Sequence, residues 1–155
     1  MVKTVKTSDV LNIYNVLNSA KYSKMDDADK IKAWKICRKL KPVASKFEED
    51  SKDAAEKFKA DIKDFDERLQ KAQEYERLRS KQEPTIDIMT TAEYDAFIKE
   101  FKEYNNLVQK AVQEFADKEI EIYFEPISED AFGKMMASNE WTMEQVTTLG
   151  DFICE

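Results

Sequence analysis

The chain has 155 residues, of which 42% are hydrophobic and 37% are charged, and its formal net charge is −7. The apolar content is too high for an intrinsically disordered chain, and only two glycines and three prolines are present, which favours long helices over a turn-rich β-fold. No run of about 18 apolar residues exists and the first residues lack the apolar core of a signal peptide, so neither a transmembrane helix nor a secretion signal is expected.

Charge is distributed unevenly along the chain. Residues 111–155 hold eleven acidic groups against two lysines, whereas residues 21–46 hold nine basic groups against three acidic ones. Such asymmetry can steer association with a charged partner, although solvation of the surface is the simpler interpretation. Cys37 and Cys154 lie in no CxxC motif, so the sequence shows no secreted disulfide framework and favours a reducing compartment, but it leaves open whether the two thiols are free.

The first 24 residues predict a short strand and a helix. Residues 2–6 alternate between valine and polar side chains, which is typical of an edge strand. Ser8 is the predicted N-cap of a helix over residues 9–20, and its apolar face consists of Val10, Ile13, Tyr14 and Leu17.

Residues 25–118 predict a long antiparallel helical hairpin. Its first arm is expected to begin at Asp26 or Asp27 and to reach about residue 79, with a kink or a break at Pro42. Residues 80–91 form the connection, in which residues 85–89 alternate like a short strand, and Thr90 with Glu93 has capping-box spacing for a helix over residues 91–117. The early part of the first arm has an apolar face of Ile31, Trp34, Cys37 and Leu40.

The two arms carry heptad-like apolar stripes that are expected to pack against each other. The same stripes are able to pair between chains, so self-association stays open. The first stripe consists of Phe58, Ile62, Phe65, Leu69 and Ala72, and the second of Tyr94, Phe97, Phe101, Tyr104, Val108, Ala111 and Phe115.

Residues 119–155 predict a strand followed by short helices. Residues 119–126 alternate polar and apolar and are expected to pair with residues 2–6 or with residues 85–89. Ser128 is the predicted cap of a helix near 129–137, and Thr142 with Gln145 opens a last helix to about residue 153. The fold class is therefore mainly α in a single domain of 155 residues, with parts at 1–24, 25–118 and 119–155.

The sequence contains none of the usual catalytic or cofactor-binding motifs. There is no histidine, no phosphate-binding glycine loop and no EF-hand loop, so we predict no catalytic residue, no metal site, no cofactor and no enzymatic activity. Basic residues between 30 and 46 are interpreted as the solvated side of a helix. With no aromatic side chain placed among them, a nucleic-acid partner is not favoured.

Two groups of residues are candidates for protein binding. Met135, Met136 and Trp141 are either core residues or a docking patch beside a loop, because methionine-rich surfaces adapt well to partners. The second group is acidic and suits a cationic partner. It consists of Glu114, Asp117, Glu119, Glu121, Glu125, Glu129 and Asp130.

The order of elements resembles a family of small helical bacteriophage and prophage proteins with no established activity. The resemblance rests on Val10–Leu17, the charged helix around Leu40–Leu78, Glu119–Ile122, Pro126–Ser128, Trp141–Gln145 and Leu149–Ile153. The chain departs from the family by the interruption at Pro42 and by its long first arm. The resemblance implies a phage setting, in the host cytoplasm or in the virion, and carries over no functional residue.

These observations lead to two hypotheses about function. The first is a non-enzymatic phage protein that acts through protein–protein interaction, as a virion or assembly component. The second is an acidic inhibitor of a host nucleic-acid-binding or defence enzyme, with the acidic residues of positions 111–155 as its binding surface.

Overall fold

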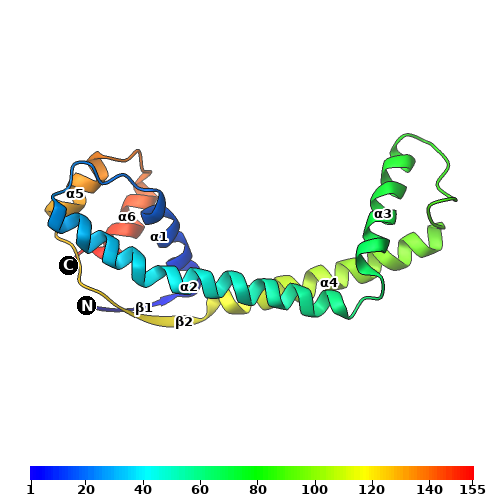
Figure 1. Cartoon of the computed structure of the whole chain (residues 1–155), viewed down its shortest axis with the longest axis horizontal. Coiled ribbons are helices and arrows are strands. Elements are labelled where there is room, and N and C mark those ends of the chain that lie inside the picture. The colour runs from blue at the N-terminus through cyan, green and yellow to red at the C-terminus, as the bar shows by residue number, and fades with distance from the viewer. The chain divides into compact units, whose positions relative to one another are not determined.

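A computed structural model describes residues 1–155 and shows a mainly α protein, as the sequence predicted (Figure 1). Six helices are joined by short connections, and two strands form one small sheet. In chain order the elements are β1 (Val2–Lys6), α1 (Thr7–Ser19), α2 (Asp27–Ala60), α3 (Phe65–Ser80), α4 (Thr91–Asp117), β2 (Glu119–Tyr123), α5 (Glu129–Ala137) and α6 (Met143–Ile153).

The chain divides into two compact units. Unit 1 is formed by Met1–Glu49 together with Phe115–Glu155, and unit 2 is formed by Asp50–Glu114. These boundaries differ from the subdivision at residues 24 and 118 that was expected from the sequence, because α2 and α4 each contribute residues to both units.

The two strands of unit 1 come from distant parts of the chain and pair antiparallel (Figure 1). Val2 lies opposite Tyr123 and Lys6 lies opposite Glu119, so the predicted pairing with residues 2–6 is confirmed, although the strand ends at Tyr123 and not at residue 126. The alternative prediction, a strand at residues 85–89, is wrong. That segment turns instead, since the backbone N–H groups of Ile88 and Met89 both donate to the Thr85 carbonyl, at 3.0 and 3.2 Å.

Helix α1 begins two residues earlier than expected, at Thr7, and Ser8 is not its cap. The extended Lys6 occupies the N-cap position without a side-chain cap bond. The backbone N–H and the hydroxyl of Thr7 both donate to the Lys118 carbonyl, each at 2.9 Å. Thr7 therefore links the strand directly to the helix, and the chain has no room for a separate serine cap.

The core of unit 1 joins helices from both ends of the sequence, and Figure 1 shows α1, α5 and α6 gathered beside the start of α2. Ile13 from α1, Leu40 from α2 and Leu149 from α6 are each at most 3% exposed. Gly150 packs so closely that a Cβ there would meet the Phe132 ring at 3.0 Å. The buried residues from these helices also include Val10, Leu17, Ala33, Ile36, Ala131, Phe132, Met135, Phe152 and Ile153.

Pro42 does not break α2, which runs without interruption from Asp27 to Ala60. A proline inside a helix leaves the carbonyl four residues before it, here that of Arg38, without its usual donor. Both residues are on the exposed side of the helix, where water can solvate that carbonyl. The break occurs later, and the expectation of one helix to about residue 79 is wrong.

The chain turns at residues 61–64, between α2 and α3. Asp64 adopts a left-handed conformation, with φ 53° and ψ 39°, and immediately precedes α3. Among residues with a side chain, aspartate and asparagine tolerate this conformation best. The apolar spacing of Phe58, Ile62 and Phe65 continues across the turn, which explains why the sequence pattern did not reveal it.

Unit 2 has its own aromatic core, which confirms part of the predicted pairing of stripes. The Phe65 ring lies 6.0 Å from that of Phe97 and 5.0 Å from that of Tyr104, and Tyr75 stacks on Tyr94 at 4.2 Å. The remaining residues of the two stripes are only partly buried, except Ala72. Ion pairs and caps complete the unit: Arg68 contacts Glu100 at 2.6 Å.

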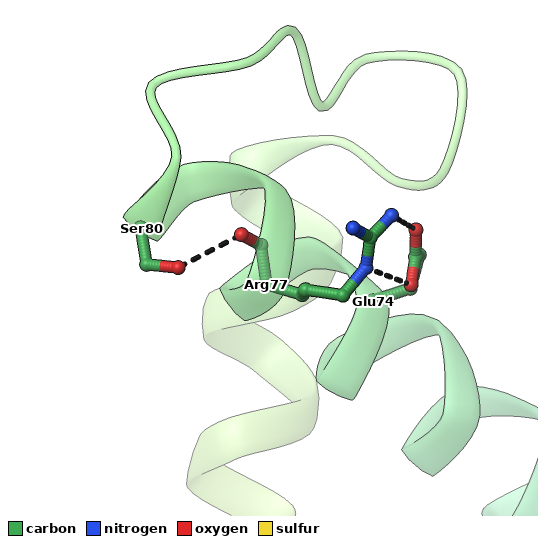
Figure 2. A network of polar contacts seen from close by, with 3 residues as sticks. All are labelled: Glu74, Arg77 and Ser80. Atoms are coloured by element: carbon green, nitrogen blue, oxygen red, sulfur yellow. Dashed lines mark hydrogen bonds and ion pairs between the residues drawn. The ribbon is translucent and has the colours of Figure 1, made fainter.

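The last turn of α3 is held by a local network that Figure 2 shows from close by. Arg77 forms a two-pronged contact with the carboxylate of Glu74, one of whose bonds measures 2.9 Å. The Ser80 hydroxyl donates to the Arg77 carbonyl at 2.8 Å and so satisfies one of the carbonyls that a helix end leaves without a donor.

Three predicted helix starts are confirmed by hydrogen bonds of their caps. Thr90 accepts from the N–H of Glu93 at 3.1 Å, and Ser128 accepts from the N–H of Ala131 at 3.2 Å. Thr142 and Gln145 form a complete capping box, with bonds of 3.2 and 2.9 Å. These local signals placed the starts of α4, α5 and α6 correctly.

Candidate functional site

The structure places the three candidate docking residues Met135, Met136 and Trp141 in or against the core of unit 1. Met135 is fully buried in the core of unit 1, and Met136 and Trp141 are half-buried against it. The Trp141 ring stacks on Phe132, with 6.3 Å between the ring centroids. Met135 and Met136 lie on α5, Trp141 lies between α5 and α6, and all three contribute to the core of unit 1.

The predicted acidic residues are all exposed, but they lie on different elements. Glu119 and Glu121 project from β2, and Glu129 and Asp130 occupy the first turn of α5. Glu125, which follows β2, forms an ion pair with Lys32 of α2 at 3.0 Å. Glu114 and Asp117 lie near the end of α4. The acidic groups are therefore spread over β2, the segment after it, the start of α5 and the end of α4.

One of these surfaces, which we call the outer sheet face, consists of Val2, Thr4, Lys6, Glu119, Glu121 and Tyr123. All six side chains are exposed, and the alternate residues of the strands are more buried. Val2 is 51% exposed and lies opposite Tyr123, which is 60% exposed. The outer sheet face thus joins an apolar pair to the carboxylates of β2.

A hydrogen bond connects the apolar and acidic parts of the outer sheet face. The Tyr123 hydroxyl donates to the Glu121 carboxylate at 3.0 Å, and this bond raises the pKa of Tyr123. At the other end of the strands, Lys6 contacts Asp117 at 3.8 Å. Glu119 and Glu121 leave the face with a net negative charge even when Lys6 is counted.

A second surface lies on α2, and the sequence pattern placed two of its apolar residues on the wrong side of the helix. Ile31 and Trp34 were expected on the buried side of the helix, but they are 51% and 56% exposed. The buried side consists of Ala33, Ile36 and Leu40. The sequence pattern gave weight to large apolar side chains, whereas the packed side of the helix uses the small Ala33.

The α2 basic face consists of Ile31, Trp34, Lys35, Arg38, Lys39 and Lys41. The Arg38 guanidinium lies over the Trp34 ring, 5.3 Å from its centroid. No acidic residue occurs between positions 30 and 46 of the sequence. This face therefore presents an apolar centre surrounded by cations, which the sequence pattern had hidden.

A groove of about 370 Å³ runs beside the α2 basic face, where α2 meets the segment after β2. It is lined by Lys32, Lys35, Ile36, Arg38, Lys39, Phe124 and Glu125. The hydrogen bond from Lys32 to Glu125 raises the pKa of this lysine and joins the two walls. Cations line most of this groove, so it extends the positive surface of α2.

A second groove, of about 300 Å³, lies between α1 and α6. Its residues are Asn12, Ile13, Asn15, Val16, Glu144, Gln145, Thr148 and Leu149, so Glu144 is its single ionisable group.

Both cysteines are free and half-buried elsewhere in unit 1. Burial raises the pKa of Cys37 and of Cys154, which keeps the thiols protonated and weakly nucleophilic at neutral pH.

No group of three or more acidic or cysteine side chains is placed to hold a metal ion. None of the helices combines the length and the apolar character that crossing a bilayer requires. Comparisons with protein-family models, with curated proteins and with solved structures found no match. The two charged faces of unit 1 are therefore the candidate sites, judged on their own chemistry.

Proposed function

We propose that this protein acts by binding other proteins through unit 1, without catalysing a reaction of its own. The observation that carries the proposal is the α2 basic face, where Trp34 and Arg38 lie together on the exposed side of a helix. Tryptophan and arginine are the residue types most enriched among those that dominate the binding energy of protein interfaces. Ile36 and Leu40 anchor the opposite side of this helix in the core, so the surface is held in place before a partner binds.

The setting of this binding function is proposed from the resemblance to small phage proteins. In that setting the chain is a component of the virion or a factor in its assembly, and its partner is a phage protein. An acidic partner surface with an apolar centre would complement the α2 basic face in charge and in the burial of Trp34.

The second candidate is inhibition of a host enzyme by the acidic residues. Its support is the exposure of the whole acidic set, which leaves these carboxylates accessible to a cationic site. In this case the bound protein would be basic, and Glu119, Glu121 and Glu125 would contribute more than Trp34 to the affinity. Binding by such exposed charges weakens steeply as the salt concentration rises.

The experiment is an affinity pull-down from phage-infected cells, analysed by mass spectrometry at low and moderate salt. Three baits are compared: the wild type, Trp34→Ala, and a control with Met143→Ala, which truncates a side chain that is 77% exposed on α6. A phage protein retained by the control and lost by Trp34→Ala supports the first candidate. A basic host enzyme retained by both variants and lost with salt supports the second, and the absence of any specific partner contradicts the binding function.

A further inference from the structure

The two charged faces of unit 1 are complementary to each other. The α2 basic face has Ile31 and Trp34 as its apolar centre and cations around it, whereas the outer sheet face has Val2 and Tyr123 as its apolar pair, followed by carboxylates. The two faces share no residue, because one is formed by α2 and the other by the strands. A chain that carries both faces is able to offer each of them to a different neighbour.

The order of the groups along the two faces also matches. Along α2, Arg38 follows Trp34 by four residues, or about 6 Å, and Lys41 follows it by seven residues, or about 10.5 Å. Along β2, Glu121 precedes Tyr123 by two residues, or about 6.8 Å, and Glu119 precedes it by four, or about 13.6 Å. When the aromatic side chains meet, the first carboxylate falls opposite Arg38, and the flexible Lys41 side chain spans the remaining few ångströms to Glu119.

We infer that the outer sheet face of one copy of this chain docks on the α2 basic face of a second copy. This inference rests on the proposed binding function and names the partner as the chain itself. The contact joins different faces of the two copies, so it is heterologous and leaves one free face at each end of the pair. Further copies then add head to tail, unless the rotation between neighbours closes a ring or a two-fold pair.

A protein face fits α2 better than a nucleic acid does. Phosphates would satisfy Lys35, Arg38 and Lys39, but they would leave the exposed Ile31 in water. Protein interfaces bury such apolar centres and surround them with a polar rim. Lys6 is the one cation of the outer sheet face, and it is paired with Asp117. Its charge is therefore compensated when this face approaches the cations of α2.

The association should be weak for a single contact. Two faces of about six residues each are much smaller than the roughly 20–30 residues per side of a standard specific interface, so binding is transient and depends on concentration. Ionic attraction between the faces falls as the Debye length shrinks from about 8 Å at physiological ionic strength to about 3 Å at 1 M. The average mass of the wild type should therefore rise with protein concentration and fall with salt.

The experiment measures the mass of the full-length chain by sedimentation and light scattering across protein and salt concentrations. An α2 variant combines Trp34→Ala with Arg38→Ala, and a sheet variant combines Glu121→Ala with Tyr123→Ala. Each variant alone should stay monomeric, with a dissociation constant at least about tenfold weaker than that of the wild type. An equimolar mixture of the two should form a one-to-one complex, because each variant keeps the face that the other lacks.

Two further variants keep the inference testable if a double variant folds poorly. Glu121→Lys leaves Tyr123 in place and should abolish self-association through charge repulsion with Arg38. Combining Glu121→Lys with Arg38→Glu in one chain should restore self-association, since the opposite charges are exchanged. Circular dichroism spectra of all variants provide the check on folding.

Several outcomes would overturn the inference. One is a wild type that stays monomeric at every concentration, and another is a mixture of the two double variants that forms no complex. A wild type that binds labelled single-stranded DNA with a steep salt dependence while remaining monomeric would assign the α2 basic face to nucleic acid instead. If the wild type does not self-associate but the pull-down captures a different protein through Trp34, this inference is wrong and the proposed binding function stays intact.

Discussion

The Arg38 guanidinium lies over the indole ring of Trp34, with 5.3 Å between the guanidinium carbon and the ring centroid. The two residues are four positions apart on α2, so they are neighbours on its exposed side. At exposed sites such a cation–π contact contributes about 0.5–1 kcal/mol. Its consequence is that one position of the tryptophan ring is favoured in the free protein, which reduces the entropy lost when a partner covers it.

The orientation of α2 predicts opposite outcomes for two neighbouring truncations. Trp34→Ala removes an exposed ring and should change the free energy of unfolding by less than about 1 kcal/mol. Ile36→Ala empties a position that is 1% exposed and should cost about 2–4 kcal/mol. Urea denaturation of both variants, followed by far-ultraviolet circular dichroism, checks this, and a larger loss for Trp34→Ala would contradict the orientation.

The turn between α2 and α3 should accept glycine. Asp64 has a φ of 53°, where glycine has no steric cost, so Asp64→Gly should be neutral or stabilising by up to about 1 kcal/mol. The control is Gln70→Gly, an exposed position inside α3, which should cost about 1 kcal/mol. Urea midpoints compare the two, and equal losses would show that Asp64 does not adopt the left-handed conformation.

The capping box of α6 should contribute measurably to stability. Thr142→Ala removes the acceptor for the N–H of Gln145 and is expected to cost about 1 kcal/mol. Thr147→Ala serves as the control, because Thr147 is exposed within the same helix and its change should stay within about 0.5 kcal/mol. Thermal unfolding of the two variants gives the difference, which should disappear if Thr142 does not cap the helix.

Tyr22 predicts a loss of stability at alkaline pH. Its hydroxyl donates to the Leu17 carbonyl, and burial raises its pKa from 10.0 to about 12. The unfolded chain therefore ionises this tyrosine first, so its contribution is complete below about pH 10 and is lost between about pH 10 and pH 12. Urea midpoints of the wild type and of Tyr22→Phe across this range test the effect.

The Tyr22→Phe variant separates this residue from the other groups that titrate at high pH. It should be less stable than the wild type at neutral pH, because the Leu17 carbonyl loses one of its two donors and keeps only the N–H of Ala20. Its stability should then fall less than that of the wild type above pH 10. Parallel curves for the two proteins would exclude Tyr22 as a source of the alkaline loss.

Local signals in the sequence were sufficient for several elements. Thr90, Ser128 and Thr142 marked helix starts correctly because a capping residue acts on backbone groups within three positions of itself. The alternation of residues 119–123 likewise predicted which side chains of β2 are exposed. The acidic part of the outer sheet face could therefore be read from the sequence.

Other features depend on tertiary packing and were missed. The side of α2 that is buried is decided by what packs against Ala33 and Ile36, so the exposure of Trp34 had no reliable local signal. Met135 is a core residue, although methionine is equally suited to an adaptable surface. The turn before α3 contains neither glycine nor proline, and the left-handed conformation of Asp64 leaves no mark in the apolar pattern.

The pairing of β1 with β2 has a consequence for how the chain folds during its synthesis. The amino group of Met1 donates to the Phe124 carbonyl, and Thr7 bonds to Lys118, so the sheet of unit 1 needs residues more than a hundred positions apart. Asp50–Glu114 emerges from the ribosome before those partners do. Unit 2 is thus able to fold first. The first strand and the apolar residues near it stay without their partners until the last quarter of the chain emerges.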